Sequence, residues 1–244
     1  MQHMYHENRK SINAFVGCKY NCVYCKPSFQ AQMKRQKPQS NGRGCQKCYD
    51  YIPHTHLERL NHAPPKTKKD EFIFMPSSGD INFMRANDFA ELLAYAERYQ
   101  DRTFLIQTKD PFCLLERCTR FPKNVLLGTT IETNLLCFDQ TRSLKYYYWD
   151  ISQAPYPCTR KNAMAKLDHS RKTITIEPIL DFTLEVMIEW MNLIKPEIIW
   201  VGYDNHNCRL PEPPLEKTQA LIDGLRTEGF DVRLKSIRKA WYEQ

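Results

Sequence analysis

Short apolar runs alternate with helix-like stretches along most of this chain of 244 residues, and no other feature restricts its fold as much. Runs typical of strands lie at 11–17, 71–80, 102–109, 124–132, 172–180, 197–204 and 231–237. Helical spacing is found at 87–100, 111–121, 158–170, 184–194 and 214–230, a further helix is expected after the cysteines at 18–25, and 145–157 is predicted to be irregular. This alternation indicates βαβ units and a parallel sheet.

The number of units limits the architecture further. About seven strands and six helices are too few for a full eight-stranded barrel with its loops. The sequence therefore predicts one α/β domain over residues 1–244, built as a partial, open (β/α)6 barrel. Residues 27–65 are mainly polar and interrupt the alternation after the first βα unit. We interpret about 36–65 of this stretch as a cysteine-containing insertion, not as a second folded unit.

Polar side chains follow several of the predicted strands. Asp80, Lys109, Glu132 and Glu177 each come at or just after the end of a strand. Because ligands of parallel α/β sheets bind at the carboxyl ends of the strands, we expect these residues to gather there. The cysteines at 18–25 follow the first strand and are expected at the same edge.

Three cysteines, Cys18, Cys22 and Cys25, lie within eight residues of one another. The polar start of the chain lacks the apolar stretch of a signal peptide, and no apolar run approaches the length of a membrane helix, so we expect a cytoplasmic protein without a membrane partner. Thiols stay reduced in that compartment, which favours metal ligation for clustered cysteines. Three thiolates can hold three corners of an iron–sulfur cube and leave one iron open, whereas a structural zinc site would need four protein ligands.

The spacing C-x3-C-x2-C, with Tyr24 before the third cysteine, resembles the signature of the radical S-adenosylmethionine (SAM) superfamily. Runs such as HTHLERL, IFMPSSGDINF and LIQTKDP are similar to a poorly characterised branch from prokaryotes and phages that is related to spore photoproduct lyase. The resemblance implies a [4Fe-4S] cluster on Cys18, Cys22 and Cys25. It also implies SAM as cofactor, reductive cleavage of SAM, hydrogen abstraction from a substrate, and an electron donor such as a reductase, flavodoxin or ferredoxin.

The resemblance also suggests cofactor contacts. Tyr24 matches an aromatic position near the adenine, and Ser78, Gly79 and Asp80 take the place of a Gly-Gly-Glu-like motif that meets the methionine ammonium. Lys109, Glu132 and Glu177 are further candidates at the barrel mouth; alternatively, Glu132 and Glu177 are interior carboxylates paired with Lys109 or Lys235. Lyase-type repair uses a hydrogen-donating cysteine, for which Cys137, just past the fourth strand, is a candidate.

A second group of potential ligands lies in the insertion. Cys45 and Cys48 have C-x2-C spacing and are followed by His54 and His56. These residues could complete a tetrahedral zinc site. An auxiliary iron–sulfur cluster, a redox dithiol and an unmetallated pair are the alternatives.

The net charge of +7 permits a polyanionic partner. Basic clusters lie at 34–37, 66–69, 159–161, 169–172 and 233–239, with aromatic residues at 146–149 and 241–242. This combination favours nucleic acid or a nucleotide-like substrate, with a peptide or protein and a small metabolite as alternatives and solvated surface charge as the simplest interpretation. A rival of another class is a non-catalytic, zinc-stabilised nucleic-acid-binding protein.

Overall fold

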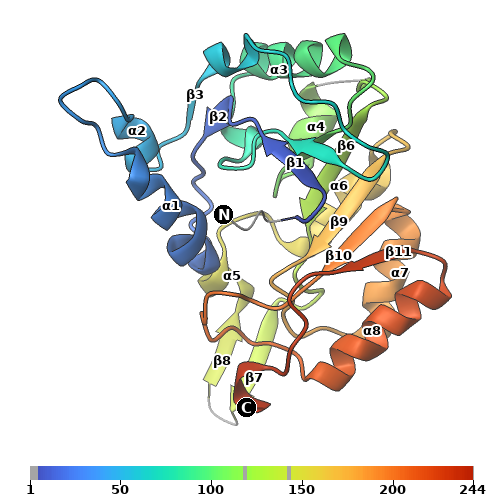
Figure 1. Ribbon diagram of the computed structural model, residues 1–244. Helices are drawn as coiled ribbons and strands as arrows, with labels where there is room; N and C mark the ends of the chain where they lie inside the picture. Colours follow the sequence, from blue (N-terminus) through green and yellow to red (C-terminus); the bar gives the residue numbers. More distant parts are fainter. Residues whose placement is uncertain (1–4, 118–119, 142–143, 244) are drawn as a thin grey trace.

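The computed structural model describes residues 5–117, 120–141 and 144–243 and contains a curled, parallel sheet (Figure 1). The sheet has seven strands in the order β1-β4-β5-β6-β9-β10-β11, and every pairing in it is parallel. The strands are β1 (Asn8–Ser11), β4 (Phe72–Phe74), β5 (Phe104–Gln107), β6 (Val125–Thr130), β9 (Lys172–Ile176), β10 (Ile198–Val201) and β11 (Asp231–Leu234). The predicted partial α/β barrel is therefore confirmed.

Helices cover the outer, convex face of this half-barrel, and its concave face opens toward the N-terminal third of the chain (Figure 1). They are α3 (Ala86–Arg98), α4 (Phe112–Arg117), α6 (Pro157–Lys166), α7 (Leu184–Ile194) and α8 (Leu215–Thr227). Their apolar residues and alternate strand residues such as Ile106, Leu127 and Ile174 form the main buried cluster. Burying these side chains supplies the principal driving force for folding.

The interior of the half-barrel is divided along its axis. Tyr5 and strand residues that face away from the helices form a second buried apolar cluster, here called the plug, near the amino ends of the strands. It consists of Tyr5, Phe72, Phe74, Leu105, Leu126, Ile198 and Trp200. Farther along the same strand face, Gln107 donates a hydrogen bond to Thr130 and accepts one from the hydroxyl of Tyr5. The concave face thus becomes polar toward the carboxyl ends of the strands.

The first strand differs from the prediction over 11–17. β1 ends at Ser11, and a second short strand, β2 (Phe15–Val16), pairs antiparallel with β3 (His54–Thr55) outside the main sheet. The side-chain oxygen of Asn13 accepts hydrogen bonds from the backbone of Ser77 and Ser78. Asn13 thereby replaces the backbone ladder at this point and lets the chain leave the sheet.

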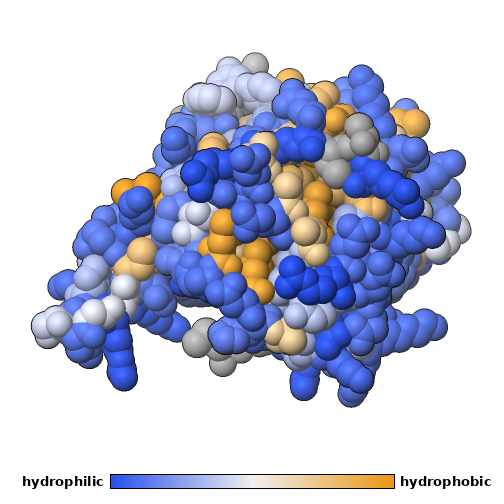
Figure 2. Space-filling model, turned by 90° about the horizontal axis from the view of Figure 1, so that it is seen from above, coloured by the Kyte–Doolittle hydropathy of each residue, from blue (hydrophilic) through white to orange (hydrophobic). Residues whose placement is uncertain are grey.

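Residues 23–60 form a lobe beside the open side of the half-barrel. Consecutive short helical segments run from Val23 to Gln36, namely η1 (Val23–Cys25), η2 (Lys26–Gln30), α1 (Ala31–Met33) and η3 (Lys34–Gln36). They are followed by α2 (Gln46–Tyr49), β3 and the 3-10 helix η4 (Leu57–Leu60). The part that carries α1 and α2 projects to the left in Figures 1 and 2, and its surface is largely hydrophilic.

The stretch predicted to be irregular at 145–157 is partly regular. β7 (Cys137–Thr141) and β8 (Leu144–Tyr147) form an antiparallel hairpin, and α5 (Tyr148–Ile151) follows directly. The tyrosines favour strand structure, but the partner strand was hidden in a segment without alternation. Within the described ranges, none of the helices combines the length and apolar character needed to cross a bilayer.

Candidate active site

The loop that carries Cys18, Cys22 and Cys25 lies at the carboxyl edge of the sheet, beside the loop after β4. Gly17 and Gly79 form a parallel bridge, in which Gly17 donates to the carbonyl of Ser78 and Asp80 donates to the carbonyl of Gly17. The backbone of Ser78 and Gly79 thus sets the position of the cysteine loop. The sequence prediction that the cysteines gather with the residues after the second main strand agrees with this arrangement.

Cys22 is the most buried of the three thiols. Its sulfur lies 3.0 Å from the hydroxyl oxygen of Ser152. A hydrogen bond from Cys25 lowers the pKa of Cys22 to about 6, assisted by the charge of Lys109 and by Ser152. The hydrogen bond with Cys22 instead raises the pKa of Cys25, and burial raises that of Cys18. Thiolates stabilised by nearby cations are suited to bind metal.

Asp80 is buried at the start of the 3-10 helix η5 (Ile81–Phe83). Its carboxylate accepts hydrogen bonds from the hydroxyl of Thr108 at 2.6 Å, from the backbone of Lys109 at 2.8 Å and from the backbone of Asn82 at 3.0 Å. Burial raises the pKa of Asp80 although these three bonds oppose the shift. An ionised carboxylate offers about four acceptor positions, so one more donor can be accommodated.

Glu132 lies at the centre of a buried polar network. One carboxylate oxygen accepts from Tyr24 at 2.5 Å and contacts the ammonium of Lys109. The other accepts from Arg160 at 2.9 Å and from Tyr148 at 3.2 Å. Arg160 also contacts Tyr148 and the carbonyl of Thr130.

The charges in this network do not cancel. Lys109 and Arg160 carry two positive charges against the single negative charge of Glu132. Burial alone would raise the pKa of Glu132, but Arg160 and Lys109 hold it well below its usual range. Burial likewise opposes the charge of Lys109, yet Glu132 and Cys22 raise its pKa. The network therefore leaves one excess buried positive charge beside the cysteine loop.

Glu177 lies in a separate ion pair with Lys235. Burial raises the pKa of Glu177 and lowers that of Lys235, and each partner opposes the shift of the other. The alternative considered from the sequence was that each glutamate is an interior carboxylate paired with a cation such as Lys109 or Lys235. The structure pairs Glu132 with Lys109 and Arg160, and Glu177 with Lys235. A cofactor contact of either glutamate stays a prediction.

Several residues of the site were not foreseen. Arg160 was assigned to a surface cluster and Tyr148 to a surface aromatic group, but both are fully buried. Charge and aromatic runs look the same in sequence whether they are solvated or buried, so no local signal distinguished these two. Cys137, the candidate hydrogen donor, is exposed at the start of β7. The half-buried Cys208 packs against the same apolar cluster as Cys18 and Cys25.

The second predicted group of ligands is also assembled. Each of four residues offers one ligand atom, and all four atoms lie within 4.8 Å of one another; the residues are Cys45, Cys48, His54 and His56. Cys45 caps the start of α2, and both histidines lie at or next to β3.

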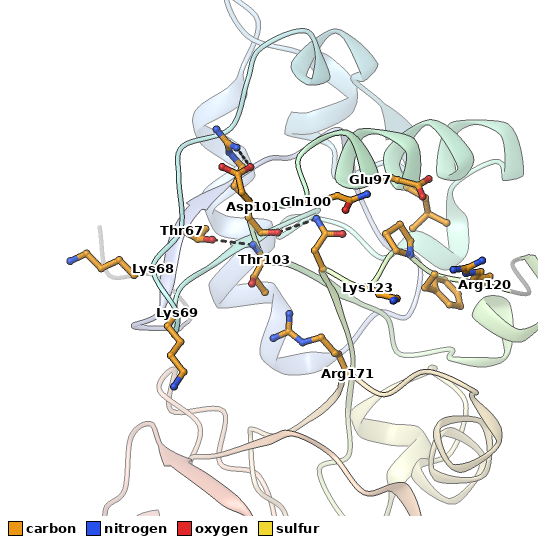
Figure 3. Close-up of a pocket in the computed structure, with 15 residues that line it drawn as sticks. Thr67, Lys68, Lys69, Glu97, Gln100, Asp101, Thr103, Arg120, Lys123 and Arg171 are labelled. Carbon is orange, nitrogen blue, oxygen red and sulfur yellow. Dashed lines mark hydrogen bonds and ion pairs between the residues drawn. The ribbon is translucent and has the colours of Figure 1, made fainter.

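A cleft of about 830 Å³ lies at the amino ends of β5, β6 and β9, away from the cysteine loop. Figure 3 shows residues that line it. Its wall includes Lys68, Lys69, Lys123 and Arg171, which belong in part to the basic clusters at 66–69 and 169–172. These cations are therefore at the opposite edge of the sheet from the candidate active site.

No family model matches the sequence, and no curated protein matches it significantly. Among solved structures, spore photoproduct lyase complexed with dinucleoside spore photoproduct superposes with a TM-score of 0.50 over 88% of this chain. The chain has the fold of spore photoproduct lyase. Sequence identity to that lyase is 11%, and the match covers 60% of the lyase chain, so this protein spans less than two thirds of it. A lyase mutant with bound AdoMet and dinucleoside spore photoproduct superposes with a TM-score of 0.49 at 12% identity.

Proposed function

We propose that this protein is a radical SAM enzyme in which Cys18, Cys22 and Cys25 hold a [4Fe-4S] cluster. The observation that carries the proposal is the position of these thiols, which lie at the carboxyl edge of a partial barrel beside a buried network with excess positive charge. Three soft sulfur donors without a fourth on the same loop fit a cluster with one open iron. When bound, such a cluster supplies the electron that cleaves SAM and so starts hydrogen abstraction from a substrate.

The residues around the loop have defined parts in this proposal. Lys109 and Arg160 offset the negative charge of the thiolates, because they contribute two positive charges against the one negative charge of Glu132. Tyr24 connects the loop to the network through its hydrogen bonds with Glu132 and Lys109. Low-dielectric surroundings strengthen such charge interactions.

Asp80 and its neighbours are the proposed contact for the methionine end of SAM. Three donors of the protein already orient the Asp80 carboxylate, which leaves about one acceptor position for an ammonium group. Glu132 and Glu177 are occupied by Lys109, Arg160 and Lys235, so a direct contact with the ribose or methionine would require these ion pairs to share the glutamates.

For the substrate we propose nucleic acid or a nucleotide-like molecule. The net charge of +7 supports an anionic substrate, and the lyase of the same fold was solved with a dinucleoside. Modification of a peptide or protein is the alternative within the same enzyme class. A zinc-stabilised nucleic-acid-binding protein without catalytic activity is the rival outside it.

The test is anaerobic purification followed by incubation with reductant and SAM. We expect brown protein with about four irons per chain at the first site and formation of 5′-deoxyadenosine. Cys22→Ala should lose both iron and SAM cleavage, whereas Cys158→Ala, which removes a half-buried thiol on α6, should retain both. Colourless wild-type protein that holds zinc at Cys18, Cys22 and Cys25 would favour the rival.

The substrate class needs its own measurement. Candidate oligonucleotides and peptides labelled with deuterium would be added to the active enzyme. Label in 5′-deoxyadenosine from an oligonucleotide supports the proposed class, and label from a peptide alone contradicts it.

A further inference from the structure

The group formed by Cys45, Cys48, His54 and His56 has the composition and geometry of a tetrahedral metal site. The Nε2 atom of His54 lies 3.4 Å from each cysteine sulfur, and that of His56 lies 3.2 Å from the sulfur of Cys48. Typical Zn–S and Zn–N bonds imply sulfur–nitrogen separations of about 3.5 Å in a tetrahedron. The two Nε2 atoms are 2.8 Å apart, so the rings would separate by roughly half an ångström around an ion.

The Nδ1 atom of each histidine already has a hydrogen-bond partner. Nδ1 of His54 lies 2.7 Å from the carbonyl oxygen of Ile52, and Nδ1 of His56 lies 2.8 Å from a carboxylate oxygen of Glu58. Both partners are acceptors, so each Nδ1 donates its hydrogen and each neutral ring directs the lone pair of Nε2 inward. Partners of this kind are usual for histidines that bind metal.

Two facing lone pairs at 2.8 Å repel each other unless a proton or a metal ion lies between them. A proton would satisfy the histidines but would not account for two thiols directed at the same point. A metal ion satisfies all four groups, because thiols lose their protons on binding and imidazole binds in its neutral form.

The arrangement also distinguishes between metals. In Rieske [2Fe–2S] clusters, which have two cysteine and two histidine ligands, the histidines bind one iron and the cysteines bind the other. Here the four ligand atoms form one compact group and all lie within 4.8 Å of one another. One ion with two sulfur and two nitrogen ligands is typical of structural zinc.

The ligands join two segments next to the cysteine loop. Val16 of β2 pairs with His54, and the backbone of His56 donates to the carbonyl of Ala14. One residue farther on, Gly17 lies so close to Ile52 and Pro53 that an added Cβ would be 2.5 Å from their backbone atoms. The ligand segment is therefore in direct contact with the strand that leads into Cys18.

We propose that Cys45, Cys48, His54 and His56 bind one structural zinc ion, which holds residues 45–56 against β2 and so fixes the start of the cysteine loop. This site is separate from the proposed enzyme activity and stands or fails independently of it. Zinc binding contributes directly to local folding, because the unfolded segment has no preformed site.

The metal content of the full chain tests the assignment. We expect about one zinc per chain by elemental analysis in wild type and also in the triple variant Cys18→Ala/Cys22→Ala/Cys25→Ala, which should contain no iron. His54→Ala should lose most of the zinc, whereas His62→Ala, at an exposed histidine outside the group, should keep it. Iron in the triple variant, absence of zinc from wild type, or a disulfide between Cys45 and Cys48 in zinc-free protein would each overturn the proposal.

Hydrogen exchange tests the structural role. Chelation of zinc from wild type should accelerate amide exchange at least about tenfold in residues 13–17 and 45–56, because the β2–β3 pairing loses its support. This measurement does not require a variant to fold. Unchanged exchange in both segments after complete zinc removal would contradict the proposed role.

Discussion

Glu132 shows how one buried carboxylate can organise residues from distant parts of the chain. Its partner Lys109 follows β5, Tyr148 begins α5, and Arg160 lies within α6. Burying an ionised carboxylate is costly unless opposite charges and hydrogen bonds compensate. Because two cations meet at Glu132, its removal would leave them buried without their shared partner.

We expect Glu132→Gln to lower the free energy of unfolding by about 3–5 kcal/mol, the usual cost of breaking a buried ion pair. Urea unfolding at neutral pH measures this loss. Glu197→Gln is the matched control, because it removes a partly exposed pair with Arg171 and should cost at most about 1 kcal/mol. Equal losses in the two variants would show that the Glu132 network is not structurally important.

The same variant predicts a pH dependence. The pKa of Glu132 in the folded protein lies below its ordinary value of 4.5, so the unfolded state binds more protons as the pH falls. The stabilisation by Glu132 is complete above that ordinary value and decreases below it. The difference in unfolding free energy between wild type and Glu132→Gln should be constant between about pH 6 and 8 and shrink below about pH 4.5. A difference that grows on acidification would contradict this sign.

At the scale of elements, the position of the cysteine loop depends on two backbone segments that approach closely. Gly17 has a positive φ of 98° and an added Cβ would overlap the backbone of Ile52 and Pro53. An added Cβ at Gly79 would lie 2.9 Å from Phe15 and 3.0 Å from the nitrogen of Gly17. Glycine at both positions lets the hydrogen bonds form between the cysteine loop and the loop that carries Asp80.

Gly17→Ala should therefore lower the free energy of unfolding more than an alanine substitution at a glycine with open space around it. Gly42→Ala is the control, because Gly42 also has a positive φ but an added Cβ meets no atom within 4 Å. Gly42→Ala should cost about 1–2 kcal/mol from the backbone conformation alone. The clash should add roughly 1–3 kcal/mol at Gly17 and reduce iron retention on gel filtration. Similar stability and iron content in the two variants would show that the segments can separate freely.

At the scale of the whole molecule, the half-barrel separates stability from chemistry along its axis. The plug that includes Trp200 fills the concave side near the amino ends of the strands, and the cysteine loop lies at the carboxyl ends. The long sequence separation between members of the plug means that it forms only when the sheet closes. Damage to the plug should therefore reduce global stability without altering the site.

Trp200→Ala should lower the free energy of unfolding by about 3–5 kcal/mol, because it empties a fully buried volume. Trp200→Phe should cost less, since the indole nitrogen has no hydrogen-bond partner among the described residues and phenylalanine keeps most of the apolar contact. Denaturant unfolding measures both losses. The folded fraction of each variant should bind iron as wild type does, and a folded Trp200→Phe protein without iron would contradict the separation.

The periodicity of the chain was sufficient to predict the parallel sheet, because strand and helix patterns are properties of neighbouring residues. Local spacing also singled out two groups of candidate ligands. Cys18, Cys22 and Cys25 share one loop, and Cys45 to His56 span a short segment whose four ligand atoms converge. The cofactor contacts predicted for Tyr24, Ser78, Gly79 and Asp80 rest on resemblance and stay predictions. The structure adds hydrogen bonds that hold Tyr24, Ser78 and Asp80 in place.

Only the tertiary structure decided which charged residues are buried. Arg160 lies in a run that resembles a solvated basic cluster, yet the curled sheet buries it against Glu132, which follows another strand. For Glu177 the sequence offered a cofactor contact or an ion pair, and the structure forms the ion pair with Lys235. The departure of β2 from the main sheet and the β7–β8 hairpin likewise depend on partners that are distant in sequence or not recognisable from alternation. The local sequence pattern indicates whether a segment prefers helix or strand. Burial and strand pairing depend instead on which segments come into contact when the chain folds.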